Sequence, residues 1–135
     1  MNNKNIVFTF FDEGYNKHNY GVIKDIVSES YVDHSPANAR SNSEAIEMLK
    51  IVERKYLNLK VTIIDLIEEN NLVATRVRYE AKCEINGERS ENKIIDIEFE
   101  ALENFRIEEG KIVESWGYWP DKEIETKIYS GTGVQ

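Results

Sequence analysis

The sequence has few of the residues from which disulfides and metal sites are built. Cys83 is the single cysteine of the 135 residues, so no disulfide can close within the chain, which suits a reducing compartment. The two histidines, His18 and His34, form no HxxxH arrangement, and zinc needs three or four converging ligands. The sequence also lacks a Gly-rich phosphate loop and a nucleophile elbow. We therefore expect no metal and no cofactor.

Long apolar runs and an excess of basic charge are also missing. The stretch from Ile6 to Phe11 is too short for the core of a signal peptide, and no segment approaches the length of a membrane span. Acidic residues outnumber basic ones by 25 to 17, the net charge is −8, and the basic residues are scattered among acids. Polyanion binding needs clustered Lys and Arg. We expect a cytoplasmic protein that binds neither nucleic acid nor membranes.

The patterns that are present indicate one α+β domain over residues 1–135, a length typical of a single domain. Apolar spacing predicts three helices in the first third of the chain. Their signatures are a face with Val7, Phe10, Phe11 and Tyr15, a short apolar segment from Gly21 to Val27, and a capping box of Ser41 and Glu44. Tyr31 to Pro36 is expected to be a loop, because proline disfavours helix in the residue before it.

The rest of the chain predicts an antiparallel meander of strands. These strands are Leu59 to Glu69, Leu72 to Ile85, Lys93 to Ile107 and Lys111 to Trp119. The turns between them fall at Asn70-Asn71, Asn86-Gly87 and Glu109-Gly110, and Asn-Gly is the strongest short hairpin signal. Helices first and strands afterwards indicate an α+β fold rather than a βαβ fold.

One residue breaks the alternation of the strand from Lys93 to Ile107. Glu103 shares its inward face with Ile95, Ile97, Phe99, Ala101, Phe105 and Ile107. A carboxylate on a buried face costs several kcal/mol unless it is paired, hydrogen-bonded or protonated. Two interpretations stay open. Glu103 is either a pocket acid or base with a raised pKa, or a residue at a strand end or bulge that reaches water or an arginine.

The last predicted strand ends in aromatic residues. Trp116, Tyr118 and Trp119 are followed by Pro120 and Asp121. Aromatic side chains at a strand end can wall a pocket for a flat ligand, but they can equally form ordinary core or a subunit interface. Asp121 follows a proline where the strand stops, so its carboxylate faces either a cavity mouth or solvent.

Four segments stand in a recognisable order: FFDEGYNKHNY (Phe10 to Tyr20), YVDHSP (Tyr31 to Pro36), LNLKVTIIDLIEENNLVATR (Leu57 to Arg76) and FRIEEGKIVESW (Phe105 to Trp116). Together they resemble the SnoaL-like polyketide cyclases of the nuclear transport factor 2-like superfamily, over about Ile6 to Asp121. The resemblance implies a cone-shaped α+β barrel, in which a strongly bent antiparallel sheet wraps around three N-terminal helices. The C-terminal helix common in those cyclases is expected to be absent, with about 122–135 forming an atypical tail.

The resemblance also implies a reaction. Cyclases of this family close a ring by an intramolecular aldol reaction without a cofactor, using an aspartate shortly after the final tryptophan, in a pattern that resembles W-D-x-x-D. Here Gly117 replaces the first aspartate, and Asp121 lies one residue later than the second. The site residues that carry over are Asn16, His34 and Trp116, together with Asp121 if a one-residue bulge re-aims it.

The sequence therefore favours a cofactor-free lyase, isomerase or cyclase that acts on an apolar carbonyl compound. Asp121 or Glu103 would transfer the proton, and His34 or Tyr79 would donate a hydrogen bond to the developing enolate. The predicted ligand contacts are Tyr15, Asn16, Tyr79, Trp116 and Tyr118. The alternative is a non-catalytic small-molecule-binding or dimerisation module on the same fold. An open pocket with two or more polar groups would favour the enzyme, and a filled cone would favour the module.

The outward face of the predicted sheet suggests an assembly. It mixes basic and acidic side chains, namely Arg76, Arg78, Lys82, Glu80, Glu98 and Glu100. Such a face suits a self-complementary contact between two copies. Since the family is commonly dimeric through its sheet, we expect a homodimer with the sheet at its interface.

Overall fold

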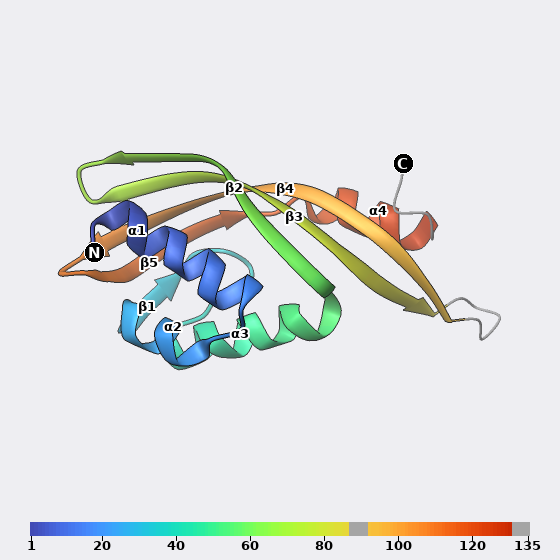
Figure 1. Cartoon of the computed structure of the whole chain (residues 1–135), viewed down its shortest axis with the longest axis horizontal. Coiled ribbons are helices and arrows are strands. Elements are labelled where there is room, and N and C mark those ends of the chain that lie inside the picture. The colour runs from blue at the N-terminus through green and yellow to red at the C-terminus, as the bar shows by residue number, and fades with distance from the viewer. Residues whose placement is uncertain (87–91, 131–135) are drawn as a thin grey trace.

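A curved five-stranded sheet organises the chain, and it stays open rather than closing into a barrel (Figure 1). The computed structural model describes residues 1–86 and 92–130. In chain order the elements are α1 (Asn3–Thr9), the π-helix η1 (Phe10–Asn16), α2 (Tyr20–Ile26), β1 (Val27–Asp33), α3 (Asn42–Lys55), β2 (Leu57–Glu69), β3 (Leu72–Asn86), β4 (Asn92–Glu108), β5 (Lys111–Tyr118) and α4 (Asp121–Ser130). The strand order is β1-β5-β4-β3-β2. The predicted α+β fold is confirmed, with an unclosed sheet where a barrel was expected.

Helices α1, α2 and α3 lie against one face of the sheet because that face is apolar (Figure 1). Alternate residues of β3 and β4 point to it and are buried: Val73, Val77, Tyr79, Cys83, Ile95, Ile97, Phe99, Phe105 and Ile107. Phe11 of η1 meets Phe105 edge to face, with ring centroids 5.5 Å apart. Gly14 lets η1 approach its neighbours closely, since a Cβ there would lie 3.2 Å from Ile23 and 3.3 Å from Leu49. The alternation of the strands therefore defines the core.

Helix α3 begins where the sequence predicts it. The Ser41 side chain accepts the backbone N–H of Glu44 at 3.1 Å, as an N-cap should. The Glu44 carboxylate accepts the backbone N–H of Arg40, one residue before the cap. Ala45 and Leu49 follow on the buried side of the helix, so the inner face of α3 is apolar.

The prediction of a loop from Tyr31 to Pro36 was wrong for its first three residues, which belong to a strand. β1 runs through Val27–Asp33 and pairs in parallel with β5, so the sheet is mixed rather than wholly antiparallel. Val27 and Tyr31 are buried against the helices, which accounts for the strand. The constraint that Pro36 places on its predecessor excludes helix, but it does not distinguish strand from loop.

The C-terminal segment, expected to be an atypical tail in place of a Gln-rich helix, begins with a helix. α4 occupies Asp121–Ser130 and packs beside β4, and its Ile124 is 4 % exposed. The Ile124 N–H donates to the carbonyl of Pro120 at 2.9 Å, so the proline that ends β5 also begins the helix. The Gly87 half of the predicted Asn86-Gly87 turn lies outside the described residues.

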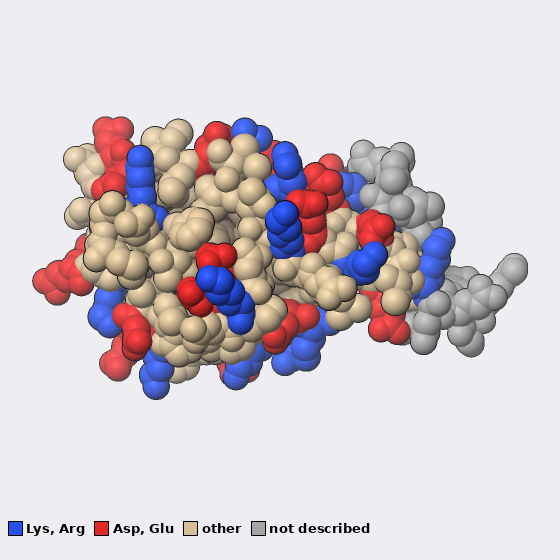
Figure 2. Space-filling view, viewed as in Figure 1, with Lys and Arg blue, Asp and Glu red and all other residues tan. Residues whose placement is uncertain are grey.

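The outward face of the sheet carries charges that are paired. The Arg76 guanidinium lies 2.8 Å from Asp65 and 3.0 Å from Glu100, and Lys82 lies 2.7 Å from Asp96. On the face of the molecule in Figure 2, acidic and basic side chains are interspersed without a continuous patch of either sign. None of the helices in residues 1–86 and 92–130 is long and apolar enough to cross a membrane.

Asn16 fastens the end of η1 to the sheet. Its Oδ1 accepts the backbone N–H of Val61 at 2.7 Å, and its Nδ2 donates to the Val61 carbonyl at 3.0 Å. Its amide is therefore committed to β2, and Asn16 does not line the cavity described below. The structure gives it a structural role and does not support the predicted ligand contact.

Asn16→Ala is expected to lower the free energy of unfolding by about 1–3 kcal/mol, because it leaves two backbone groups of Val61 without partners. Urea unfolding followed by circular dichroism measures the loss. Asn104→Ala is the matched control, since Asn104 is exposed on the outer face of β4, and it should cost less than about 0.5 kcal/mol. Equal losses in the two variants would contradict the role given to Asn16.

Candidate functional site

An open cavity of about 400 Å³ lies between α3 and the inner face of the sheet, where β5 passes into α4. Most of its wall is apolar, from Phe10, Ala39, Ala45, Met48, Leu49, Val52 and Phe105. The lining residues with polar side-chain atoms are Tyr15, Tyr31, Asp33, His34, Ser35, Glu103, Ser115, Tyr118, Trp119 and Asp121. A volume of this size lies in the usual range of small-molecule sites, and the mixture of an apolar wall with polar groups is typical of them.

Glu103 is the central polar group of the cavity. Its side chain projects from β4 on the same face as Phe105, and the residue is 8 % exposed. The hydroxyl of Tyr79, which is fully buried on β3, donates a short hydrogen bond to Glu103 Oε2. Burial raises the pKa of Tyr79 well above its usual range, so this hydroxyl keeps its proton.

Burial raises the pKa of the Glu103 carboxyl from 4.5 to about 7, and the negative charge of Asp33 acts in the same direction. Hydrogen bonding by Tyr79 and Trp119 opposes the rise without cancelling it. At neutral pH Glu103 is thus present in both its acid and its ionised form. A carboxyl in this condition can accept a proton and return it.

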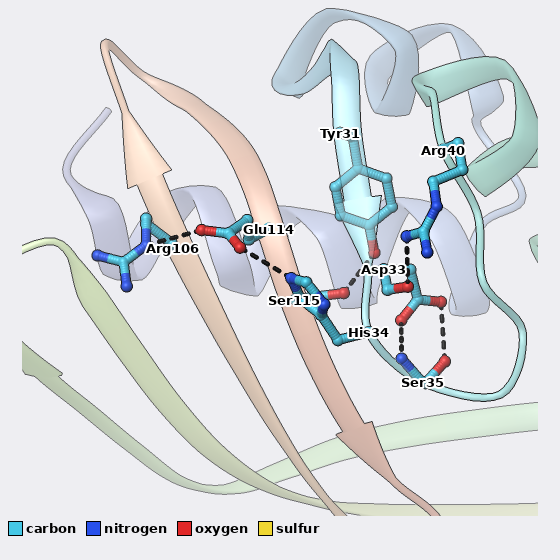
Figure 3. A network of polar contacts seen from close by, with 8 residues as sticks. All are labelled: Tyr31, Asp33, His34, Ser35, Arg40, Arg106, Glu114 and Ser115. Carbon is cyan, nitrogen blue, oxygen red and sulfur yellow. Dashed lines mark hydrogen bonds and ion pairs between the residues drawn. The ribbon is translucent and has the colours of Figure 1, made fainter.

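Tyr31 and Ser115 form a second pair of polar groups in the cavity wall, and the sequence did not predict them. The Tyr31 hydroxyl of β1 and the Ser115 hydroxyl of β5 form a short hydrogen bond across the parallel strand pair (Figure 3). Each hydroxyl has one proton, and their mutual bond uses one of the two. Because both residues line the cavity, the other proton is available to a ligand. The signal for these residues was their place in the YVDHSP and FRIEEGKIVESW segments.

The register of β5 against β4 decides which of its side chains reach the cavity. Gly117 lies opposite Glu103, and Ser115 lies opposite Phe105. Between Arg106 and Ile107 the register shifts by one residue, which directs the odd-numbered residues beyond the shift inward. Trp119 continues this series and lines the cavity, with its ring centroid 4.7 Å from that of Tyr79.

The predicted contacts Trp116 and His34 lie mainly outside the cavity. Trp116 has the opposite parity, so it faces outward, where the Arg106 guanidinium lies 5.8 Å from its ring centroid. His34 stacks on Trp116 with centroids 5.0 Å apart, and its Nε2 lies 2.8 Å from Glu114 Oε2. Figure 3 shows the imidazole directed to Glu114. Although His34 contributes to the cavity wall, its ring is committed elsewhere, which does not support the predicted donor role.

Of the other predicted site residues, two are buried near Glu103 and two lie at the cavity opening. Tyr15 is buried and lines the cavity, with its ring centroid 5.5 Å from that of Tyr79. Tyr79 is bound to Glu103 but is not itself part of the cavity lining, which does not support the predicted ligand contact. Tyr118 is 69 % exposed and Asp121 is exposed at the first turn of α4, and both border the opening. No bulge re-aims Asp121 into the interior. Its carboxylate can meet a ligand only at the mouth.

Within residues 1–86 and 92–130, no three His, Cys, Asp or Glu side chains lie close enough together to hold a metal ion. The polar groups of the cavity come from separate elements and form hydrogen bonds with hydroxyl and amide donors. Their arrangement suits proton transfer to and from an organic ligand.

Comparison with known proteins identifies the family. Residues 5–127 match the SnoaL-like polyketide cyclases, and the chain belongs to that family. No curated protein matches the chain. Similar solved structures include IdmH from Streptomyces antibioticus, a candidate polyketide cyclase, with a TM-score of 0.82, 16% identity and coverage of 99% of this chain and 100% of that one.

Two further structures show the range of proteins that share the fold. A candidate SnoaL-like polyketide cyclase from Jannaschia sp. CCS1 has a TM-score of 0.80 and 15% identity, over 93% of this chain and 90% of that one. An LEH-like epoxide hydrolase from M. tuberculosis has a TM-score of 0.73 and 12% identity, over 96% of this chain and 86% of that one. At such identities the likeness establishes the fold and leaves the chemistry to be argued from the site.

The raised pKa of Glu103 makes stability depend on pH. The native state holds this proton more tightly than the unfolded chain, so its stabilising effect is present below pH 4.5 and is lost as the pH rises through about 7. Relative to Glu103→Gln, which cannot titrate, the parent should lose up to about 3 kcal/mol of unfolding free energy over that interval. Urea unfolding at a series of pH values measures the difference.

Glu108→Gln is the matched control, because Glu108 is an exposed residue at the end of the same strand. Its stability should follow that of the parent across the series. A parent and a Glu103→Gln variant with parallel pH profiles would show that Glu103 is not desolvated in solution.

Proposed function

We propose that the chain is a cofactor-independent isomerase or cyclase that acts on an apolar carbonyl compound, with Glu103 as acid and base. The observation that carries the proposal is a buried carboxyl group with a pKa of about 7 in a ligand-sized cavity. A proton-transfer group works best when its pKa lies near the working pH. The cavity is open and holds several polar groups, which favours an enzyme over the binding module.

The reaction begins when ionised Glu103 removes a proton from the carbon next to the ligand carbonyl. The electron pair of that bond moves onto the carbonyl oxygen and produces an enolate. The hydroxyl proton that the Tyr31–Ser115 hydrogen bond leaves unused is donated to this oxygen, which stabilises its negative charge. Burial raises the pKa of Tyr31, so its hydroxyl stays protonated.

The second step returns the proton. In an isomerase, protonated Glu103 delivers it to another carbon of the enolate system. In a cyclase, the enolate carbon attacks a second carbonyl group of the same molecule, and the new alkoxide oxygen takes the proton from Glu103. Both routes leave Glu103 ionised and consume no other reagent.

The position of Glu103 supports its assignment over Asp121. Gly117 stands where the family pattern has its first aspartate, and Glu103 is its direct neighbour across the β4–β5 pair. Glu103 Oε1 lies 3.6 Å from the place that a Cβ would take on Gly117. A carboxylate thus reaches nearly the same part of the cavity from the adjacent strand. Asp121 is exposed at the mouth and is not desolvated in this way.

The test is the exchange of the α-protons of β-tetralone in deuterium oxide, followed by NMR. The parent should accelerate exchange above the buffer rate, with a rate that rises around pH 7. Glu103→Gln should lower the acceleration by at least about 10²-fold, since it keeps the shape and removes the base. Asp121→Asn, the matched control at the mouth, should change the rate by less than about threefold and the stability by less than about 0.5 kcal/mol.

Two results would contradict the proposal. Loss of exchange in Asp121→Asn with full exchange in Glu103→Gln would assign the base to Asp121. A parent that binds apolar ketones without exchanging their protons would establish the small-molecule-binding module instead.

We also propose that the protein acts as a cytoplasmic homodimer that associates through the outward face of the sheet. Leu102 and Tyr118 are cross-strand neighbours on that face and are 57 % and 69 % exposed, which leaves apolar surface beside the paired charges. A symmetric contact would cover this surface on both copies. The single cysteine, Cys83, is buried and cannot form a disulfide within the chain, which supports a reducing compartment.

Sedimentation equilibrium should give a mass of twice 15.7 kDa that falls towards the monomer on dilution. Tyr118→Asp should weaken the association by at least about tenfold, because it places a charge in the contact. Glu108→Gln, which leaves the apolar pair unchanged, should not. A mass of 15.7 kDa that does not depend on concentration would rule the dimer out.

A further inference from the structure

The carboxylates of the cavity are not neutralised by the protein. Asp33, Glu103 and Asp121 line it, and within residues 1–86 and 92–130 the lining contains neither lysine nor arginine. None of the three takes part in an ion pair with a described residue. On the outward face, by contrast, Asp65 and Glu114 each form an ion pair with an arginine. The cavity therefore contains three carboxylates that have no lysine or arginine partner among the described residues.

The surroundings of Asp33 show this most clearly (Figure 3). Its two carboxylate oxygens accept the backbone N–H and the hydroxyl of Ser35, each at 2.8 Å. Arg40 approaches the same residue, but its Nη1 donates to the Asp33 backbone carbonyl at 3.2 Å. His34 is bound to Glu114 on the other side of β5. Neutral donors hold the carboxylate of Asp33 in place, and no described cation forms an ion pair with its oxygens.

We infer that the ligand of this cavity carries a protonated amine beside Asp33 and an apolar body that extends to Glu103. A carboxylate with two bound donors still has free lone pairs, so an ammonium group can bind it directly. A half-buried carboxylate beside an apolar wall gains a charge-assisted hydrogen bond when a ligand cation binds it. The same field opposes carboxylate and phosphate ligands, and the net charge of −8 attracts cations from a distance.

This inference rests on the proposed function only for the carbonyl group of the ligand, and it names the substrate class as an apolar amino ketone. The amine site itself depends on the cavity and its charges. The ionisable groups around Glu103 are mostly acids or phenols: Tyr15 from η1, Tyr31 and Asp33 from β1, Tyr79 from β3, Tyr118 from β5 and Asp121 from α4. His34 is the one basic group among the described lining residues, and its imidazole is bound to Glu114. α3 faces it with Ala45, Met48, Leu49 and Val52, which do not ionise. A cation in this cavity is supplied by the ligand.

The experiment compares three aromatic probes that differ only in charge: naphthylmethylamine, naphthylmethanol and naphthoate. Calorimetry at neutral pH should give affinities in the order amine, alcohol, acid, with at least about tenfold between amine and alcohol. Bound amine favours ionised Glu103, so its binding should release protons. Repeating the titration in buffers of different ionisation enthalpy measures that release, which the alcohol should not produce.

Asp33→Asn should weaken binding of the amine by about tenfold and leave binding of the alcohol unchanged, which also shows that the cavity is intact. Asp65→Asn is the matched control on the outward face and should alter neither. Naphthoate that binds as tightly as the amine would overturn the inference. So would a full affinity for the amine in Asp33→Asn, or no binding of the amine to the parent.

The outcomes separate this inference from the proposed function. Proton exchange in β-tetralone without a preference for the amine would refute the inference and keep the acid-base role of Glu103. A preference for the amine without proton exchange would refute that role and keep the amine site.

Discussion

Residues that alternate onto the apolar face of the sheet are buried between the sheet and the helices. One of these residues is Glu103, which carries a carboxyl group. An isolated charge in such a position would cost several kcal/mol, so its neighbours are restricted. Tyr79 approaches from β3 with a hydrogen bond to one oxygen, and Gly117 on β5 leaves space beside the other. α3 contributes only apolar atoms on the far side. The cavity is the space that this arrangement leaves unfilled.

The distribution of charge follows from the same division between two faces. On the outward face, water and long side chains allow arginine and lysine to meet aspartate and glutamate, and the charges are paired there. On the inward face, a lysine or arginine would have to fill the cavity to reach Glu103. The carboxylates of the cavity therefore have no lysine or arginine partner among the described residues, whereas several carboxylates on the outward face of the sheet do.

The sequence predicted most of the fold and about half of the site, for reasons that differ from element to element. Alternation placed Glu103 on the buried face without knowledge of any neighbour, because the period of a strand is a local property. Tyr31 and Ser115 could not be found in this way, since they meet across a parallel pair separated by most of the chain. Trp116 was predicted from the family pattern, but the register shift in β5, which has no local signature, turns it outward and Ser115 inward. α4 was missed because its short amphipathic pattern follows a proline that also ends a strand.

The pairing of Glu103 with Gly117 limits which residues this position of β5 can hold. A Cβ on Gly117 would lie 3.6 Å from Glu103 Oε1, so a longer side chain there would meet the carboxyl group directly. A second carboxyl group at that place would be close enough to share one proton with Glu103, because two adjacent carboxylates repel each other. Glycine therefore leaves Glu103 without a competing acid across the β4–β5 pair.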